Sequence, residues 1–119
     1  MNVYKMNPFP LAGNTCADDV TIISTETKTT LAGSYNYAGE HNGVPYYTAD
    51  SGYLYRAGNG NWHLHNVKFH ESAIFWARAS DCPFDSITWH SWDSTIDSWA
   101  PLSGFSVKGH THGKIVIKI

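Results

Sequence analysis

Short runs in which apolar and polar residues alternate occupy most of the chain. The stretch DVTIIST at 19–25 is rich in β-branched residues, and WHLHNVKF at 62–69 alternates aromatic or aliphatic positions with polar ones. Successive side chains of a strand point to opposite faces of a sheet, so this pattern predicts strands that are half buried. Tyr35 and Tyr37 alternate in the same way, and YLY at 53–55 gives a further strand.

Turn signals separate these runs at intervals of roughly ten residues. They are Asn42-Gly43, DSG at 50–52 and GNGN at 58–61. Asn-Gly and Gly-Asn between alternating runs predict hairpins, because both residue types tolerate positive φ. The sequence therefore predicts an all-β fold: a small antiparallel β-sandwich or a barrel-like meander.

Two later segments allow a helix as well as a strand. SAIFWARASD at 72–81 has three alanines that raise its helix propensity, and Trp89, Trp92, Ile96 and Trp99 fit helical spacing. The surrounding meander favours a strand in the first case. Ser, Asp and Thr crowd the second, so we expect ITWHSW at 87–92 to be a strand followed by a loop. GFSVKG at 104–109 and KIVIKI at 114–119 are predicted to be the closing strands.

Residues 1–19 read as an extended N-terminal arm in front of a single β domain at 20–119. Pro8 and Pro10 oppose a helix. Apolar residues are interspersed among them, so the arm either wraps the sheet of its own domain or docks on a neighbouring subunit. Its predicted interface residues are Tyr4, Phe9 and Leu11.

Composition narrows the class of protein. The chain has 119 residues, of which 42% are hydrophobic and only 15% charged, and its net charge is −2. The 8 basic residues are scattered, so no basic stripe is present to neutralise phosphates, and we expect no nucleic-acid partner. No apolar run resembles a signal peptide or is long enough to span a bilayer. We expect a soluble protein made without a classical export signal and no membrane partner.

Cys16 and Cys82 are far apart in the sequence. They can form one disulfide, but one distant pair is not a disulfide framework, and buried free thiols are ordinary in proteins. Both alternatives stay open at this point.

The meander also carries a family resemblance. Gly33-x-Tyr35, Gly39, Asn42-Gly43-x-Pro45-Tyr46-Tyr47, YLY at 53–55 and Trp62 together resemble a small β module of bacteriophage structural proteins and large bacterial surface proteins. The likeness spans about residues 20–100, with AIFWARASDCPFD where the module has an aromatic strand and a Pro-Asp loop. The matching residues are turn and core residues, so the resemblance implies a fold and a virion setting. HLH at 63–65 departs from the module, which more often carries Val, Ile or Ser there.

GHTHG at 109–113 is similar to the His-x-His elements of phage tail fibres and spikes. In those proteins three chains place two histidines each on a buried iron or zinc ion. The resemblance implies a site built by His110 and His112 on the axis of a homotrimer, since imidazole suits both metals. A second pair, His63 and His65, would complete a zinc site within one chain if it met the first. Otherwise both pairs are polar residues on an outward face.

A different pattern suggests carbohydrate binding. WHSWDSTIDSW places aromatic rings beside carboxylates, and indole rings stack on sugars while carboxylates bind hydroxyl groups. The candidate residues are Trp89, Trp92, Asp93, Asp97 and Trp99. A glycosidase would need a cleft between two carboxylates, which short turns do not provide. The sequence also has no phosphate loop, no nucleophile elbow and no CxxC pair, so we expect no enzyme.

These observations predict a phage virion protein: a capsid decoration (cement) protein, a tail fibre or a tail-tip component. It would act by association with other virion proteins and with copies of itself. The alternative is an extracellular carbohydrate-binding module that recognises a glycan of the host surface. No cofactor is expected apart from iron or zinc on the trimer axis.

Overall fold

The computed structural model describes residues 16–25, 29–84 and 88–111. This part of the chain contains nine strands and no helix, as the alternating pattern predicts. No helix long and apolar enough to cross a membrane occurs in these ranges. The strands are β1 (Asp19–Ser24), β2 (Gly33–His41), β3 (Val44–Ala49), β4 (Gly52–Arg56), β5 (Trp62–His65), β6 (Phe75–Ala77), β7 (Trp89–Asp93), β8 (Ser98–Pro101) and β9 (Phe105–His110).

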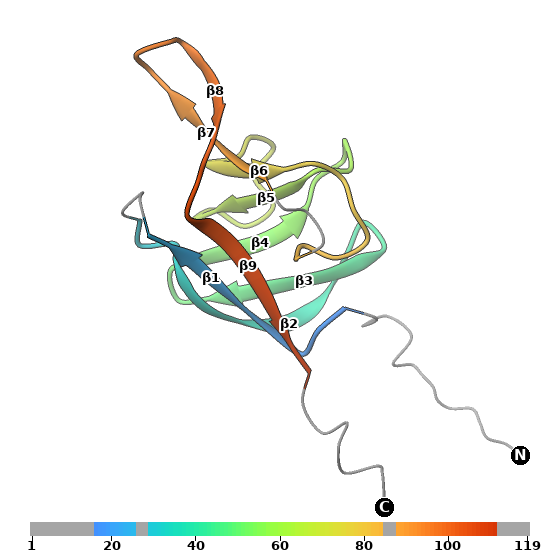
Figure 1. The fold of residues 1–119 in the computed structure, drawn as a ribbon. Coiled ribbons are helices and arrows are strands. Elements are labelled where there is room, and N and C mark those ends of the chain that lie inside the picture. Colours follow the sequence, from blue (N-terminus) through green and yellow to red (C-terminus); the bar gives the residue numbers. More distant parts are fainter. Residues whose placement is uncertain (1–15, 26–28, 85–87, 112–119) are drawn as a thin grey trace, which may run out of the picture.

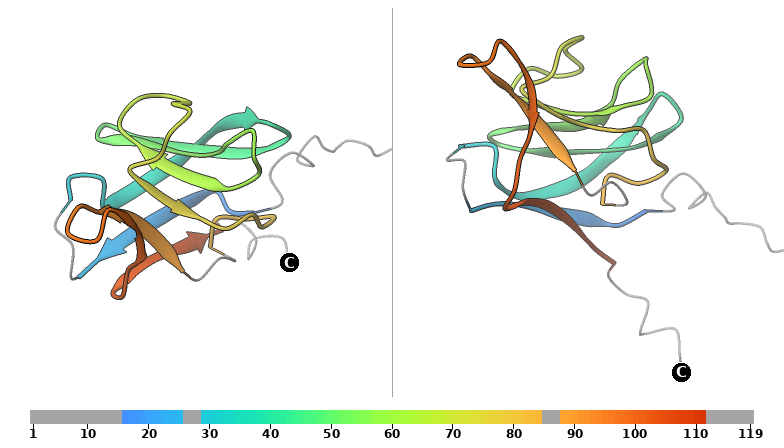
Figure 2. Two further views of the ribbon diagram at one scale, coloured as in Figure 1. Left: turned by 90° about the horizontal axis from the view of Figure 1, so that it is seen from above. Right: turned by 45° about the horizontal axis from the view of Figure 1, so that its top comes forward.

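All of these strands belong to one antiparallel sheet with the order β8-β7-β6-β5-β4-β3-β2-β1-β9 (Figure 1). Each strand pairs with the one before it, except that β9 returns to β1, where Ile22 lies opposite Val107. The sheet curls into a half-barrel (Figure 2). The Phe105 ring of β9 stacks on Phe75 of β6 at 4.9 Å, so the two ends of the strand order share one core. The prediction of a barrel-like meander is confirmed.

The predicted turns lie where the sequence placed them. Asn42 and Gly43 join β2 to β3 with φ angles of 54° and 81°, the pair of positive values that a type I′ hairpin requires. The segment at 72–81 contains strand β6, as expected. The expected loop after ITWHSW is wrong, because residues 98–101 form strand β8 and Trp92 lies opposite Trp99. Ser94, Thr95 and Asp97 lie in the turn between these two strands, and Asp93 and Ser98 are the strand residues that flank it.

The core lies on the concave face of the sheet and is rich in aromatic rings. Trp62, Tyr35 and Tyr47 are among its fully buried side chains. The two tyrosine hydroxyls donate to backbone carbonyls, Tyr35 to Leu31 at 2.7 Å and Tyr47 to Ala17 at 2.7 Å. A buried phenol thus satisfies its polar end while its ring fills the core. Further core residues are Val20, Ile22, Leu54, Leu64, Phe75, Ala77, Trp89, Phe105 and Val107.

Cys16 and Cys82 form a disulfide, which decides between the two alternatives that the sequence left open. The bridge links the segment before β1 to the loop after β6. Next to it, the backbone N–H and carbonyl of Ala17 both bond to the Tyr47 hydroxyl. The start of the described chain is therefore held against the domain. Asp19, the last residue of the predicted arm, begins β1. Tyr4, Phe9, Leu11 and the KIVIKI segment lie outside the described residues.

Candidate functional site

A continuous row of rings crosses the convex face of the sheet, opposite the core. Cross-strand partners share one face of a sheet, and the register pairs Tyr55 with His63, His63 with Trp76, and Trp76 with His90. Two residues after His90, and therefore on the same face of β7, Trp92 lies opposite Trp99 of β8. We call these six residues the outer-face row: Tyr55, His63, Trp76, His90, Trp92 and Trp99.

One end of the outer-face row is exposed on the β7–β8 hairpin, which projects from the body of the domain (Figure 1). Trp92 is 51% exposed, Trp99 is 38% exposed, and Ile96 in the connecting turn is 60% exposed. The two indole rings meet edge to face at 5.6 Å and 84°. We call Trp92, Ile96 and Trp99 the hairpin tip. Large apolar side chains gathered in this way make the hairpin tip a candidate interaction surface.

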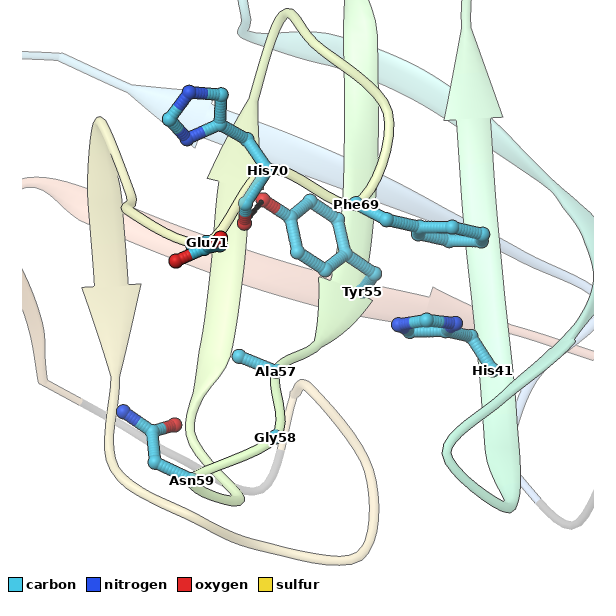
Figure 3. A pocket seen from close by; sticks show the side chains of 8 residues that line it. All are labelled: His41, Tyr55, Ala57, Gly58, Asn59, Phe69, His70 and Glu71. Carbon is cyan, nitrogen blue, oxygen red and sulfur yellow. Dashed lines mark hydrogen bonds between the residues drawn. The ribbon is translucent and has the colours of Figure 1, made fainter.

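Loop 66–74 covers the other end of the outer-face row. Its Phe69 ring stacks on His41 at 3.6 Å and 7°, and the Tyr55 hydroxyl donates to the His70 carbonyl at 2.6 Å (Figure 3). Phe69 has a φ of 55°, a conformation that costs a bulky residue roughly 1–3 kcal/mol. The surrounding rings of His41, Tyr46 and Tyr55 hold it there.

Two cavities lie beside this loop and share Asn59 and Glu71 in their linings. The first, about 340 Å³, is bounded by His41, Tyr55 and Phe69 (Figure 3). The second, about 240 Å³, lies next to Trp76 and Trp99 and reaches His63. The convex face therefore offers both an exposed apolar hairpin and a recess with polar groups at its rim.

His65 and His70, at the end of β5 and within loop 66–74, both accept backbone hydrogen bonds through their rings. The Nδ1 atoms of His65 and His70 accept the backbone N–H groups of Val67 at 2.9 Å and Ser72 at 3.0 Å. The two rings stack at 4.4 Å, so a charge on both would be repulsive. Burial lowers the pKa of His65, and a coulombic contribution from His70 lowers it further.

His63 lies deeper, and it is only 5% exposed. Burial lowers its pKa, while a hydrogen bond to the backbone of His70 opposes that shift. The sequence predicted an outward polar face here. The side chain does lie on the convex face, opposite the core, but the outward exposure expected for it is wrong because loop 66–74 covers it.

Acid should destabilise this fold through these histidines. Burial lowers the pKa values of His41, His63 and His65 from their ordinary 6.5, so the unfolded chain takes up protons first as the pH falls. Their contribution to stability is full above the unfolded pKa and is lost as the pH falls through 6.5 toward the folded values. Denaturant unfolding should give a lower free energy at about pH 5.5 than at about pH 7.5.

His63→Phe keeps a ring in the outer-face row and removes one of these groups, so it should show a smaller pH dependence. Between these two pH values ordinary carboxylates stay charged, which isolates the histidines. Equal or greater stability of the wild-type chain at the lower pH would contradict the assignment.

His110 and the second predicted histidine pair, His63 and His65, do not form a metal site in the described part of the fold. His110 ends β9, and its Nε2 lies 3.0 Å from the Thr21 hydroxyl oxygen. His63 and His65 lie on β5, five positions away in the strand order. In the ranges that the structure describes, no three His, Cys, Asp or Glu side chains are grouped as a metal site would need. His112 lies outside those ranges, so a site on a trimer axis stays a prediction.

The predicted sugar-binding residues divide between core and surface. Trp89 is fully buried in the core, so its ring is not available to a ligand. Asp93 accepts the N–H and hydroxyl of Thr95 through one carboxylate oxygen, and these bonds lower its pKa. Asp97 has a φ of 52° and forms part of the same turn. Trp92 and Trp99 are exposed, as the carbohydrate alternative requires, but they are perpendicular and do not form a flat platform.

Most of the residues that line the second cavity beside His63 and Trp99 were not predicted as site residues from the sequence. Trp76 alternates with buried Phe75 and Ala77, so its outward position follows once β6 is assigned as a strand. Asn59, Asn61 and Glu71 come from two loops that meet only in the folded chain. No local pattern marks them.

Comparisons with protein-family models, with curated proteins and with solved structures found no match to this chain.

Proposed function

We propose that this protein is a structural protein that acts by self-association, with the hairpin tip buried against a second copy of the chain. The observation that carries the proposal is the exposure of Trp92, Ile96 and Trp99 on one projecting hairpin. Trp is among the residues most enriched at the energetic centres of interfaces. Burial of such side chains contributes roughly 25 cal/mol for each Å² of apolar surface removed from water.

The geometry of the tip favours a protein partner over a sugar. Perpendicular indoles form a ridge rather than a platform, and Ile96 between them has no group that binds a hydroxyl. β8 is also the last strand in the sheet order. One of its edges is therefore unpaired within the described chain, and an unpaired edge is a template for pairing with another chain.

We further propose that the assembly is part of a phage virion, as a decoration, fibre or tail-tip subunit. The turn and core residues that resemble the phage module support this setting. The Cys16–Cys82 disulfide agrees with it, since disulfides persist outside the reducing cytosol. A homotrimer is the form that would complete a metal site with His110 and His112, and iron or zinc bound in that form is part of the proposal.

Substitution at the hairpin tip should weaken association without unfolding the chain. Trp92→Ala combined with Ile96→Ser removes the two most exposed apolar side chains of the tip, and we expect the dissociation constant to rise at least about tenfold. Sedimentation over a concentration series measures it. Val67→Ser is the matched control, because Val67 is 49% exposed but lies in loop 66–74. Unchanged association of the double variant would contradict the proposal.

A further inference from the structure

We propose that the cavity beside Trp76 and Trp99 binds a single neutral ring that carries hydroxyl groups, such as a hexopyranose. This site shares only Trp99 with the residues that the sequence suggested for carbohydrate binding. Trp99 is also part of the hairpin tip, but the two most exposed tip residues, Trp92 and Ile96, are absent from the lining of this cavity. The lining residues are Asn59, Asn61, His63, Glu71, Ser72, Ala73, Trp76 and Trp99.

Two indoles give the cavity its apolar wall. The rings of Trp76 and Trp99 lie 6.4 Å apart at 86° and so form a corner. Trp76 also stacks on His90 at 4.3 Å and 13°, which fixes the plane of its ring. A rigid indole loses little conformational entropy on binding and presents a large apolar surface. The C–H face of a pyranose matches such a surface.

The rim of the cavity supplies both hydrogen-bond donors and acceptors. The side-chain oxygen of Asn59 accepts the N–H of Asn61, and that of Asn61 accepts the N–H of Ala79. The NH₂ group of each amide is therefore the donor that it presents to a ligand. Glu71 contributes carboxylate acceptors, and Ser72 contributes a hydroxyl group that acts as either.

His63 gives an independent indication that a ligand forms a hydrogen bond here. It is 5% exposed and lines the cavity. Its Nδ1 is buried and has no hydrogen-bond partner in the described part of the chain. A ligand hydroxyl would satisfy this atom in either tautomer of the ring, because a hydroxyl group both donates and accepts.

Size and charge narrow the ligand class. A cavity of about 240 Å³ lies below the roughly 300–1,000 Å³ typical of sites for drug-sized ligands, which leaves room for one ring. Glu71 is the charged residue of the lining, and it disfavours phosphates and carboxylates. Mixed donors and acceptors beside two indoles suit a polyhydroxylated ring better than a quaternary ammonium ion, which has no hydroxyl group to satisfy the Nδ1 atom of His63.

Titration of the intact chain with glucose, galactose, mannose and N-acetylglucosamine tests this site, with tetramethylammonium as the cationic comparison that has no hydroxyl group. Tryptophan fluorescence and amide chemical shifts report binding. We expect saturable changes with at least one sugar, and none with tetramethylammonium. Trp76→Ala and His63→Phe should each weaken that binding by about tenfold or more, because each removes one wall or one hydrogen bond.

Glu71→Ala is a third variant that tests the site if Trp76→Ala or His63→Phe does not fold. Glu71 is exposed in loop 66–74, and its carboxylate contributes to the rim. This substitution should also weaken sugar binding, whereas Ile96→Ser should leave it unchanged, because Ile96 is exposed in the β7–β8 turn and absent from the lining. Three results would overturn the proposal: no saturable change with any of the four sugars, binding of tetramethylammonium alone, or wild-type sugar affinity in the Trp76, His63 and Glu71 variants. Association through the hairpin tip is measured separately, by sedimentation.

Discussion

Removal of the disulfide by Cys16→Ser combined with Cys82→Ser is expected to lower the free energy of unfolding by about 4 kcal/mol. The two cysteines are 66 residues apart, so the bridge closes more than half of the chain into one loop and restricts the unfolded ensemble. The bridge also sits beside Ala17, whose bonds to the Tyr47 hydroxyl hold the start of the described chain. Guanidinium denaturation of the two oxidised and purified chains measures the difference.

The same experiment on the wild-type chain with a reductant present is the control. Reduced wild type and the double variant should unfold at similar denaturant concentrations, because both lack the cross-link. A difference of less than about 1 kcal/mol between the oxidised wild type and the double variant would show that the bridge does not restrain the unfolded chain as proposed.

Trp89→Ala is expected to lower the free energy of unfolding by about 3–5 kcal/mol, the usual cost of emptying a buried Trp site. Trp89 is fully buried and packs against Phe105 at 5.6 Å, where the two ends of the strand order meet. Trp92 lies three residues further along the same strand but is 51% exposed. Trp92→Ala should therefore cost no more than about 1 kcal/mol, mainly from its edge-to-face contact with Trp99.

Trp89→Phe sharpens this comparison. The buried Nε1 of Trp89 has no hydrogen-bond partner among the described residues, so loss of its N–H should carry little penalty. The Phe variant should lie between wild type and Trp89→Ala in stability. If Trp92→Ala proved as destabilising as Trp89→Ala, the assignment of the two rings to opposite faces of β7 would be wrong.

The sequence predicted the local parts of the fold well. Asn42-Gly43 requires positive φ angles that suit a two-residue hairpin, and alternation around Tyr35 and Trp62 identifies strands. The pairing of β9 with β1 was not predictable in this way, because it joins residues such as Ile22 and Val107 from opposite ends of the chain. No local pattern encodes that contact.

The candidate site was predictable only in part. Trp89 and Trp92 are three residues apart, so assigning β7 as a strand already places them on opposite faces, and one of them must be buried. Trp89, Trp92, Ile96 and Trp99 also fit the spacing of a helix, in which they would share one face, so the opposite positions of Trp89 and Trp92 were not predicted. His63 could not be recognised as buried, since the loop that covers it is held by Phe69 and His70 through contacts that no spacing reveals.

The native mass of the intact chain, measured by equilibrium sedimentation over a range of concentrations, tests the central claim most directly. Self-association through the hairpin tip predicts a mass that is a multiple of the 13.2 kDa of one chain, with a trimer as the proposed form. Dilution should shift that mass toward one chain. A mass of 13.2 kDa at every concentration would contradict the account.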